Sequence, residues 1–242
     1  PLDDVIVDFK DTTENEARLS LQIKRSLTDS NAESNNDFRD IIRDSWATFK
    51  KNNFRFGIDR YGTAVGTISS AKERALKTLC DWARESLTPE HFNARFAPNG
   101  SASDEIRAIK ETILSLLEKI NGTPCADDEA HQFLAHFVLI QFDFLREGNM
   151  DSPEAINRIR ECLAPNEGCK APLVWGKMIQ WARDSAGKSG QFNRIRLVKD
   201  VSHLVQLRGA PSIVSDLNKL TELARSYVSL IPDDISGINV ER

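Results

Sequence analysis

The 242-residue sequence has few of the residues that mark zinc-binding or disulfide-linked proteins. Its four cysteines include no CxxC pair and its four histidines are scattered, so no zinc-finger spacing is present. Reduced, buried thiols in a cytoplasmic protein are the expected interpretation. The cysteines and histidines concerned are Cys80, Cys125, Cys162, Cys169, His91, His131, His136 and His203.

Long apolar runs and a basic surplus are missing as well. No run approaches the roughly 18 apolar residues of a membrane span, and there is no signal-peptide pattern. The formal net charge of −4 and the pI near 5.7 argue against a generic polyanion-binding domain. They do not exclude a nuclease, because its carboxylates hold metal and its basic residues need only be local. The remaining composition is that of an ordinary globular protein.

The first hundred residues predict an α/β fold. Two segments, 5–9 and 19–24, alternate apolar and polar residues around the polar segment 11–15, which predicts a β-hairpin. Apolar residues at helical spacing then predict a helix from Phe38 to Phe49. The chain begins at Pro1 directly in a strand-like segment, so we expect its natural N-terminus to lie upstream.

A third strand and a second helix are expected next. The run 54–58 alternates like a strand, the glycine-containing stretch 61–66 is expected to connect, and Ala71 to Ser86 has the pattern of a helix. The predicted order is therefore β-β-α-β-α.

The second half of the chain is predicted to be mainly helical. The segment 96–103 is the best linker candidate, and Ser103 is a typical N-cap for a helix that ends at Asn121-Gly122. We therefore expect an α+β/α chain, with an α/β core at 1–97 and a helical connector and assembly region at 98–242. Further helices are expected over 127–144, from 152, after Pro172, around 197–204 and around 217–227.

The predicted hairpin brings three polar side chains together. With its turn around residues 12 to 15, paired residues have numbers that sum to 27 or 28, which places Asp4 opposite Ile23 or Lys24. Alternation puts Gln22 and Lys24 on one face of their strand, and Asp4 shares a face with Asp8. If the apolar faces of both strands point to one core, then Asp4, Gln22 and Lys24 converge on the opposite, polar side.

Such a cluster suits phosphodiester hydrolysis. Mg²⁺ in proteins is held by one or two carboxylates together with other oxygens and water. Asp4 would supply the carboxylate, with the side-chain carbonyl of Gln22 and the backbone carbonyl of Ile23 as further metal ligands. Lys24 would orient the attacking water and stabilise the charge of the transition state.

The pattern of Asp4, then Gln22-Ile23-Lys24, a helix and a further strand resembles the PD-(D/E)xK nuclease superfamily. Leu21–Ser26 following Leu2–Val5 is similar to the double-stranded DNA endonuclease domains of bacterial antiphage effectors. These occur in cyclic-oligonucleotide-activated systems and at the N-terminus of Avs-type STAND NTPases. The resemblance covers about residues 1–90, and the tail 213–242 is more loosely similar to the helical segment that precedes the NTPase.

The resemblance implies an endonuclease that uses Mg²⁺ or Mn²⁺ to cleave double-stranded DNA in antiphage defence. It also implies activation by oligomerisation, as a dimer or tetramer, and a phage trigger protein sensed through a downstream NTPase. The chain departs from the family pattern in two ways. Gln22 replaces the usual acidic residue, and the helix with a glutamate that precedes the first strand is absent from this sequence.

Other interpretations remain open. The cluster Lys50, Lys51, Arg55 and Arg60 either tracks DNA phosphates or is a solvated surface. The chain could also be a non-catalytic helical interaction or DNA-binding module with a degenerate nuclease fold. A weaker alternative is a helix-turn-helix-like reader at 192–207, near basic residues. These are Arg194, Arg196, Lys199 and Arg208.

Overall fold

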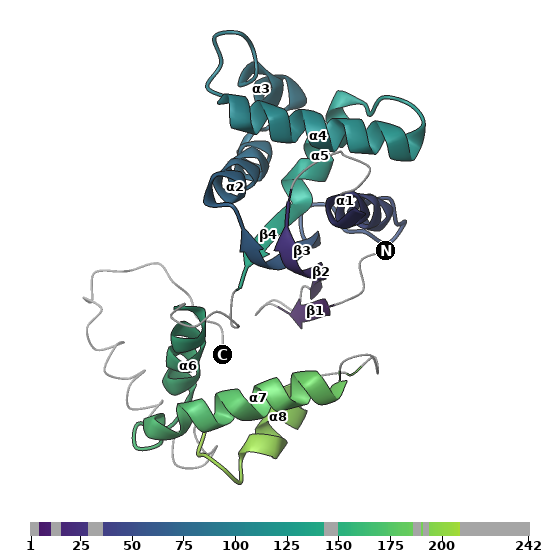
Figure 1. Ribbon diagram of the computed structural model, residues 1–242. Coiled ribbons are helices and arrows are strands. Elements are labelled where there is room, and N and C mark those ends of the chain that lie inside the picture. Colours follow the sequence, from purple (N-terminus) through teal and green to yellow (C-terminus); the bar gives the residue numbers. More distant parts are fainter. Residues whose placement is uncertain are drawn as a thin grey trace, which may run out of the picture. The chain divides into compact units, whose positions relative to one another are not determined.

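The computed structural model describes residues 5–10, 16–28, 36–142, 150–185, 190 and 194–208. These residues form two compact units (Figure 1), one ending at Phe142 and the other beginning at Met150. The boundary expected after residue 97 falls inside the first unit, because the helices that follow it pack on the same core as the sheet.

The first unit contains a four-stranded mixed sheet with the order β1-β2-β3-β4. β1 and β2 are antiparallel, whereas β2 pairs with β3, and β3 with β4, in parallel. The strands are β1 (Val5–Lys10), β2 (Glu16–Leu27), β3 (Arg60–Ile68) and β4 (Phe137–Gln141).

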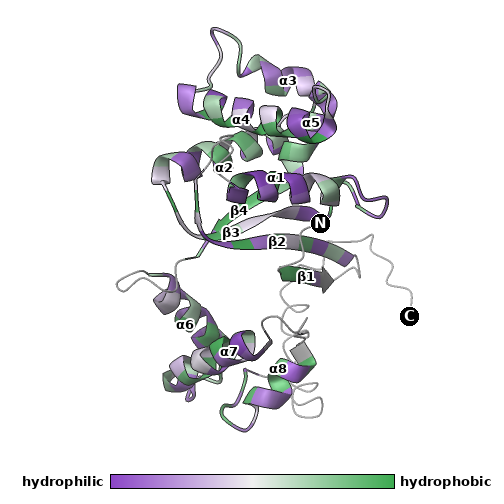
Figure 2. Ribbon diagram, turned by 45° about the vertical axis from the view of Figure 1, so that its right-hand side comes forward, coloured by the Kyte–Doolittle hydropathy of each residue, from purple (hydrophilic) through white to green (hydrophobic). Residues whose placement is uncertain are grey.

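Helices connect the parallel strands and lie on one side of the sheet in both Figure 1 and Figure 2. One connection runs from β2 to β3 and the other from β3 to β4, so the chain advances across the sheet in one direction. Right-handed crossovers therefore place both sets of helices on the same face. The first connection contains α1 (Asn36–Phe49), and the second contains α2 (Ser70–Glu85), α3 (Pro89–Ala94), α4 (Asp104–Asn121) and α5 (Asp127–His136).

The core lies between these helices and the sheet. The Tyr61 ring on β3 is fully buried and stacks on Phe133 of α5, with 5.4 Å between ring centroids. The Tyr61 hydroxyl donates a hydrogen bond of 2.7 Å to the carbonyl of Phe133. Trp46 and Phe49 of α1 pack edge-on against the same Phe133 ring. Aromatic side chains from α1, α5 and β3 thus form the centre of the first unit.

The second unit is a smaller helical assembly around a short apolar core. Its helices are α6 (Asp151–Cys162), the 3-10 turn η1 (Gly168–Lys170), α7 (Ala171–Ser185) and α8 (Arg194–Val201). Its buried core residues are Leu163, Ala171, Val174, Val201 and Val205. The helices predicted from residue 152 and after Pro172 are confirmed, and the one predicted around 197–204 is confirmed over its first half.

The capping signals of α4 are confirmed. The Ser103 hydroxyl accepts the N–H of Ile106 at 3.4 Å, and Gly122 ends the helix with a positive φ of 72°. Both residue types stabilise helix ends, because serine supplies an acceptor and glycine adopts the left-handed conformation without strain.

The predicted positions of the third strand and of the connection after it are wrong. Residues 54–58 form turns, and the third strand is β3, from Arg60 to Ile68, where a connection was expected. Gly62 lies inside this strand, at a position where a Cβ would clash with the carbonyl oxygen of Val138. Glycine is required there by the close approach of β4.

The helix expected over 127–144 is also shorter than predicted. α5 ends at His136, and the next residues form β4. Residues 137–140 are all apolar, and a continuous apolar run of this kind fits a strand as well as a helix. These residues form a strand because they pair with β3, where Tyr61 lies beside Phe137 and Thr63 beside Leu139.

The hairpin register and its faces differ from the prediction. Val5 pairs with Leu21 and Lys10 with Glu16, so paired numbers sum to 26, because the connecting residues 11–15 are centred on Thr13. The face with Leu19, Leu21 and Ile23 is the one away from the helices, and none of the three belongs to the core, although Leu21 is 5% and Ile23 47% exposed. The expectation that this face packs on the core is wrong, because the handed crossovers place the helices on the other side.

Candidate metal and nucleic-acid site

Gln22 and Lys24 share the face of β2 that points toward the helices. Gln22 lies beside Thr63, and Lys24 beside Val65, in the parallel ladder with β3. Both side chains are only partly exposed. Alternation correctly predicted that the two side chains share a face, but this face points toward α1 and its neighbours, whereas the prediction placed it on the side away from the core.

Lys24 is held by a carboxylate that the sequence did not suggest for this site. Its Nζ lies 2.8 Å from Oδ1 of Asp37, in the first turn of α1. The Asp37 side chain is 56% exposed and that of Lys24 is 22% exposed. An ion pair this exposed contributes less than about 1 kcal/mol. The available signal was an aspartate at the start of the helix that follows the Gln-x-Lys strand.

The side-chain amide oxygen of Gln22 is a buried hydrogen-bond acceptor. This Oε1 has no hydrogen-bond partner among the residues that the structure describes, whereas the backbone carbonyl of Gln22 accepts the Thr63 hydroxyl at 2.9 Å. A buried, unsatisfied acceptor costs about 1–3 kcal/mol. An amide oxygen in this condition fits the requirement of Mg²⁺ for oxygen ligands. The chemistry of Gln22 is therefore compatible with one position in a metal coordination sphere.

The other two predicted metal ligands are Asp4 and the backbone carbonyl of Ile23. Asp4 and the turn at residues 12–15 lie outside the described residues. The Ile23 side chain points away from the helices, and only its backbone carbonyl was predicted to bind metal. Within the ranges that the structure describes, no group of three or more histidine, cysteine, aspartate or glutamate side chains comes together. The proposed ligand set therefore depends on Asp4 and on neutral oxygens.

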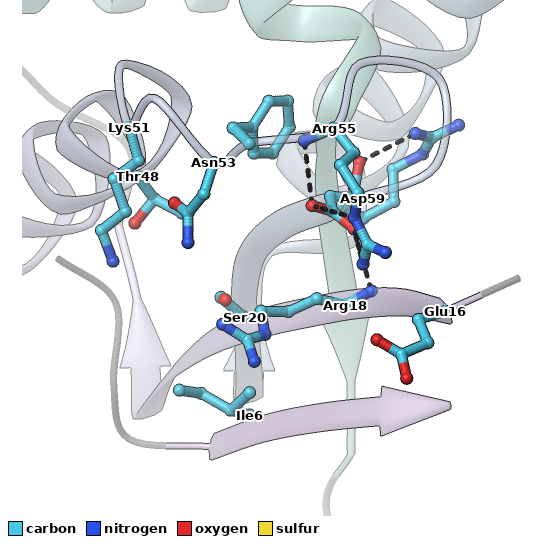
Figure 3. Close-up of a pocket in the computed structure, with 11 residues that line it drawn as sticks. Ile6, Glu16, Arg18, Ser20, Thr48, Lys51, Asn53, Arg55 and Asp59 are labelled. Atoms are coloured by element: carbon cyan, nitrogen blue, oxygen red, sulfur yellow. Dashed lines mark hydrogen bonds and ion pairs between the residues drawn. The ribbon is translucent and has the colours of Figure 1, made fainter. Parts of the chain in front are cut away.

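A polar pocket of about 210 Å³ lies on the same side of β2, next to the loop that follows α1. Figure 3 shows Lys51 and Asn53 on one side of this pocket, and Arg18 and Ser20 of β2 on the other. Basic and other polar side chains form most of its wall. The lining residues are Ile6, Glu16, Arg18, Ser20, Thr48, Lys51, Asn53, Phe54, Arg55, Asp59 and Arg60.

Asp59 ties the elements around this pocket together. It is 5% exposed, and its carboxylate accepts the backbone N–H groups of Arg18 at 3.1 Å and of Arg55 at 3.0 Å. The Arg55 guanidinium donates a further bond of 2.8 Å. Burial raises the pKa of Asp59, but the Arg55 side chain and the two backbone N–H groups outweigh it, so the pKa is lowered. The charged form of Asp59 fixes the loop to β2.

The four cations of the pocket have different partners. Arg18 pairs with Asp8 at 2.7 Å, and this hydrogen bond raises the pKa of Arg18. Arg60 donates to the backbone carbonyl of Asp59 at 2.9 Å, and burial lowers its pKa. Lys51 makes no ion pair with any residue that the structure describes. Two cations, Lys51 and Arg60, therefore lack a described carboxylate partner.

The predicted basic cluster divides into two parts. Lys51, Arg55 and Arg60 all line the pocket. Lys50 instead forms an ion pair with Glu129 of α5 and lies over the Trp46 ring, 4.7 Å from its centroid. Arg18 joins the cluster from β2, a position that spacing along the chain did not connect with residues 51–60.

The comparisons with known proteins supply no family. No family model, no curated protein and no solved structure matches the chain. Among the helices that the structure describes, none has the length and apolar character of a membrane span.

Proposed function

We propose that the chain is a metal-dependent endonuclease domain that cleaves double-stranded DNA, with Gln22 and Lys24 of β2 at its reacting centre. The observation that carries the proposal is the buried Gln22 Oε1, to which no described residue donates and which lies on the same strand face as Lys24. Asp4 supplies the anionic metal ligand in this proposal.

Each residue has a distinct role. A bound Mg²⁺ or Mn²⁺ would neutralise charge on the scissile phosphate and acidify a water molecule. Gln22 would contribute its amide oxygen, and the backbone carbonyl of Ile23 a second neutral oxygen. Lys24 would orient the attacking water, for which its ammonium has to exchange its contact with Asp37 for the substrate.

The polar pocket supports a phosphate-containing substrate. Ser20 belongs to its wall, and Gln22 follows on the same strand face. Two residues of a strand span about 7 Å, so the pocket begins one strand repeat from the proposed metal ligand. Lys51, Arg55 and Arg60 would contact phosphate groups of the DNA, and such contacts position a duplex without reading its sequence.

Cleavage of both DNA strands requires two reacting centres, so we propose an oligomer, a dimer or a tetramer, as the active form. A role in antiphage defence, with a phage protein as trigger sensed through a downstream NTPase, rests on the resemblance of residues 1–90 alone.

The sharpest variant is Gln22→Leu, which removes the amide oxygen and keeps the approximate size of the side chain. Plasmid cleavage in Mg²⁺ should fall by about 100-fold or more, as it should in Asp4→Ala and in chelator. Because an unsatisfied buried acceptor is removed, the free energy of unfolding should stay equal or rise by about 1–3 kcal/mol. Cleavage by Gln22→Leu at the intact rate, or cleavage that persists in chelator, would contradict the proposal.

A non-catalytic DNA-binding module is the second candidate, favoured by the Lys24–Asp37 ion pair, which occupies the lysine. This candidate predicts that the intact chain binds DNA without cleaving it in any oligomeric state, and that binding is lost in Lys51→Ala.

A further inference from the structure

We propose that the polar pocket binds a terminal phosphate monoester of a nucleic-acid strand, with Lys51 and Arg60 as its main cationic contacts. The inference rests on the proposed function in one respect, because it takes the ligand to be nucleic acid. It goes further by assigning this pocket to a strand end and not to the continuous backbone.

Two cations of the pocket are available to an anion. Four cations line the pocket, and they face three carboxylates, Glu16 and Asp59 in its wall and Asp8 beside Arg18, which leaves a surplus of one positive charge. Asp59 is already engaged by Arg55 and by backbone N–H groups, and Arg18 pairs with Asp8 outside the lining. A phosphate monoester carries about −1.5 to −2 charge at pH 7, compared with about −1 for a backbone diester. Lys51 and Arg60, the two lining cations without a described carboxylate partner, can together neutralise a monoester, whereas one of them is enough for a diester.

The small volume of the pocket also fits a strand end. Its volume of about 210 Å³ is below the roughly 300–1,000 Å³ of sites that take whole drug-sized ligands. It is a concave site with room for a phosphate and part of a sugar. Neutral polar groups complete the wall, namely the Ser20 side chain, which is 4% exposed, and the amide of Asn53.

Several side chains and backbone groups around the pocket are already held in place by Asp59. Asp59 fixes the backbone of Arg18 and both the backbone and the guanidinium of Arg55. The ends of the loop that carries Lys51 and Asn53 are anchored by α1 and by this carboxylate. A site whose side chains are already ordered loses less conformational entropy when it binds a small anion.

The test compares strand ends. A short fluorescent DNA duplex is titrated into the full chain in chelator, with a 5′-phosphate, a 3′-phosphate or hydroxyl ends. A phosphorylated end should bind about tenfold more tightly than hydroxyl ends. Lys51→Ala and Arg60→Ala should each remove most of this preference, whereas Lys50→Ala should keep it, because Lys50 is held by Glu129. Equal affinity for all ends, or a preference that survives in Lys51→Ala and Arg60→Ala, would overturn the inference.

Two further arms identify the ligand and separate this inference from the proposed function. Inorganic phosphate and a 5′-mononucleotide are added as competitors, and displacement at the duplex's own affinity would overturn the assignment to a nucleic-acid end. The titration is repeated in Lys24→Ala. The end preference should be unchanged there even if no variant cleaves DNA, so failure of the nuclease proposal and failure of the pocket are seen independently.

Discussion

His136, at the end of α5, joins the helical layer to the loop next to the polar pocket. Its Nδ1 donates to the carbonyl of Gln132 at 2.8 Å, and its Nε2 accepts the backbone N–H of Gly57 at 3.0 Å. This arrangement requires a neutral imidazole with its proton on Nδ1. Burial lowers the pKa of His136 below its ordinary value of 6.5, although the bond to Gln132 acts in the opposite direction.

Acidification should therefore destabilise the first unit through His136. The unfolded chain binds this proton at a higher pH than the folded chain does, so stability is fully present above about pH 6.5 and is lost as the pH falls through the lower, folded pKa. Urea unfolding measured from slightly alkaline to mildly acidic pH should show a smaller loss in His136→Gln than in the intact chain. The exposed His203 is the control, and an identical pH dependence in His136→Gln and His203→Gln would exclude this role.

At the residue scale, the alternation of side chains between the two faces of a strand was enough to predict that Gln22 and Lys24 share a face. The contact with Asp37 could not be predicted, because it depends on the path of α1 back across the sheet. The same limit applies to Arg18, which meets Arg55 and Asp59 only after β2 and β3 pair. Long-range strand pairing is invisible to local periodicity.

At the scale of elements, the capped and strongly periodic helices and the two hairpin strands were predicted, whereas β3 and β4 were not. α4 was recognised by Ser103 and Gly122, whose chemistry is local. β3 was missed because all of its central residues are buried, so it shows no alternation between polar and apolar positions. The hairpin face was assigned wrongly because hydrophobicity alone does not determine which face a handed crossover covers.

The glycines of β3 and α7 should respond in opposite ways to the same substitution. In Gly62→Ala the new methyl group meets the Val138 carbonyl, and the strands have to separate, at a cost of about 1–3 kcal/mol. Gly176 lies in a helix, and a Cβ added there would meet nothing within 4 Å, so Gly176→Ala should stabilise α7 by about 0.5–1 kcal/mol. Thermal unfolding monitored by circular dichroism measures both, and equal effects would show that β3 and β4 do not approach as described.

At the scale of the whole molecule, the two units have unequal cores. The first contains most of the buried aromatic residues, whereas the second rests on five small or medium apolar side chains. Short chains bury a smaller fraction of their surface and are less stable. The division also means that the sheet, Gln22, Lys24 and the polar pocket all belong to one compact unit.

A fragment of residues 1–149 should therefore fold alone and keep the phosphate preference of the intact chain, and a fragment of residues 150–242 should be the less stable of the two. Circular dichroism melts and the strand-end titration on each fragment measure this. A first fragment without cooperative unfolding would show that its core is insufficient without the remainder of the chain.

The proposed reacting centre lies on the polar face of β2, so the loss of Lys24 from that face should slow cleavage. Single-turnover cleavage of plasmid DNA in Mg²⁺ is compared between Lys24→Ala and Lys77→Ala, because Lys77 is also an ion-paired lysine, bonded to Glu73 at 2.6 Å on α2. We expect Lys77→Ala to cleave at the intact rate and Lys24→Ala to be slower by about 100-fold or more. Equal rates in the two variants would show that this face of β2 takes no part in cleavage.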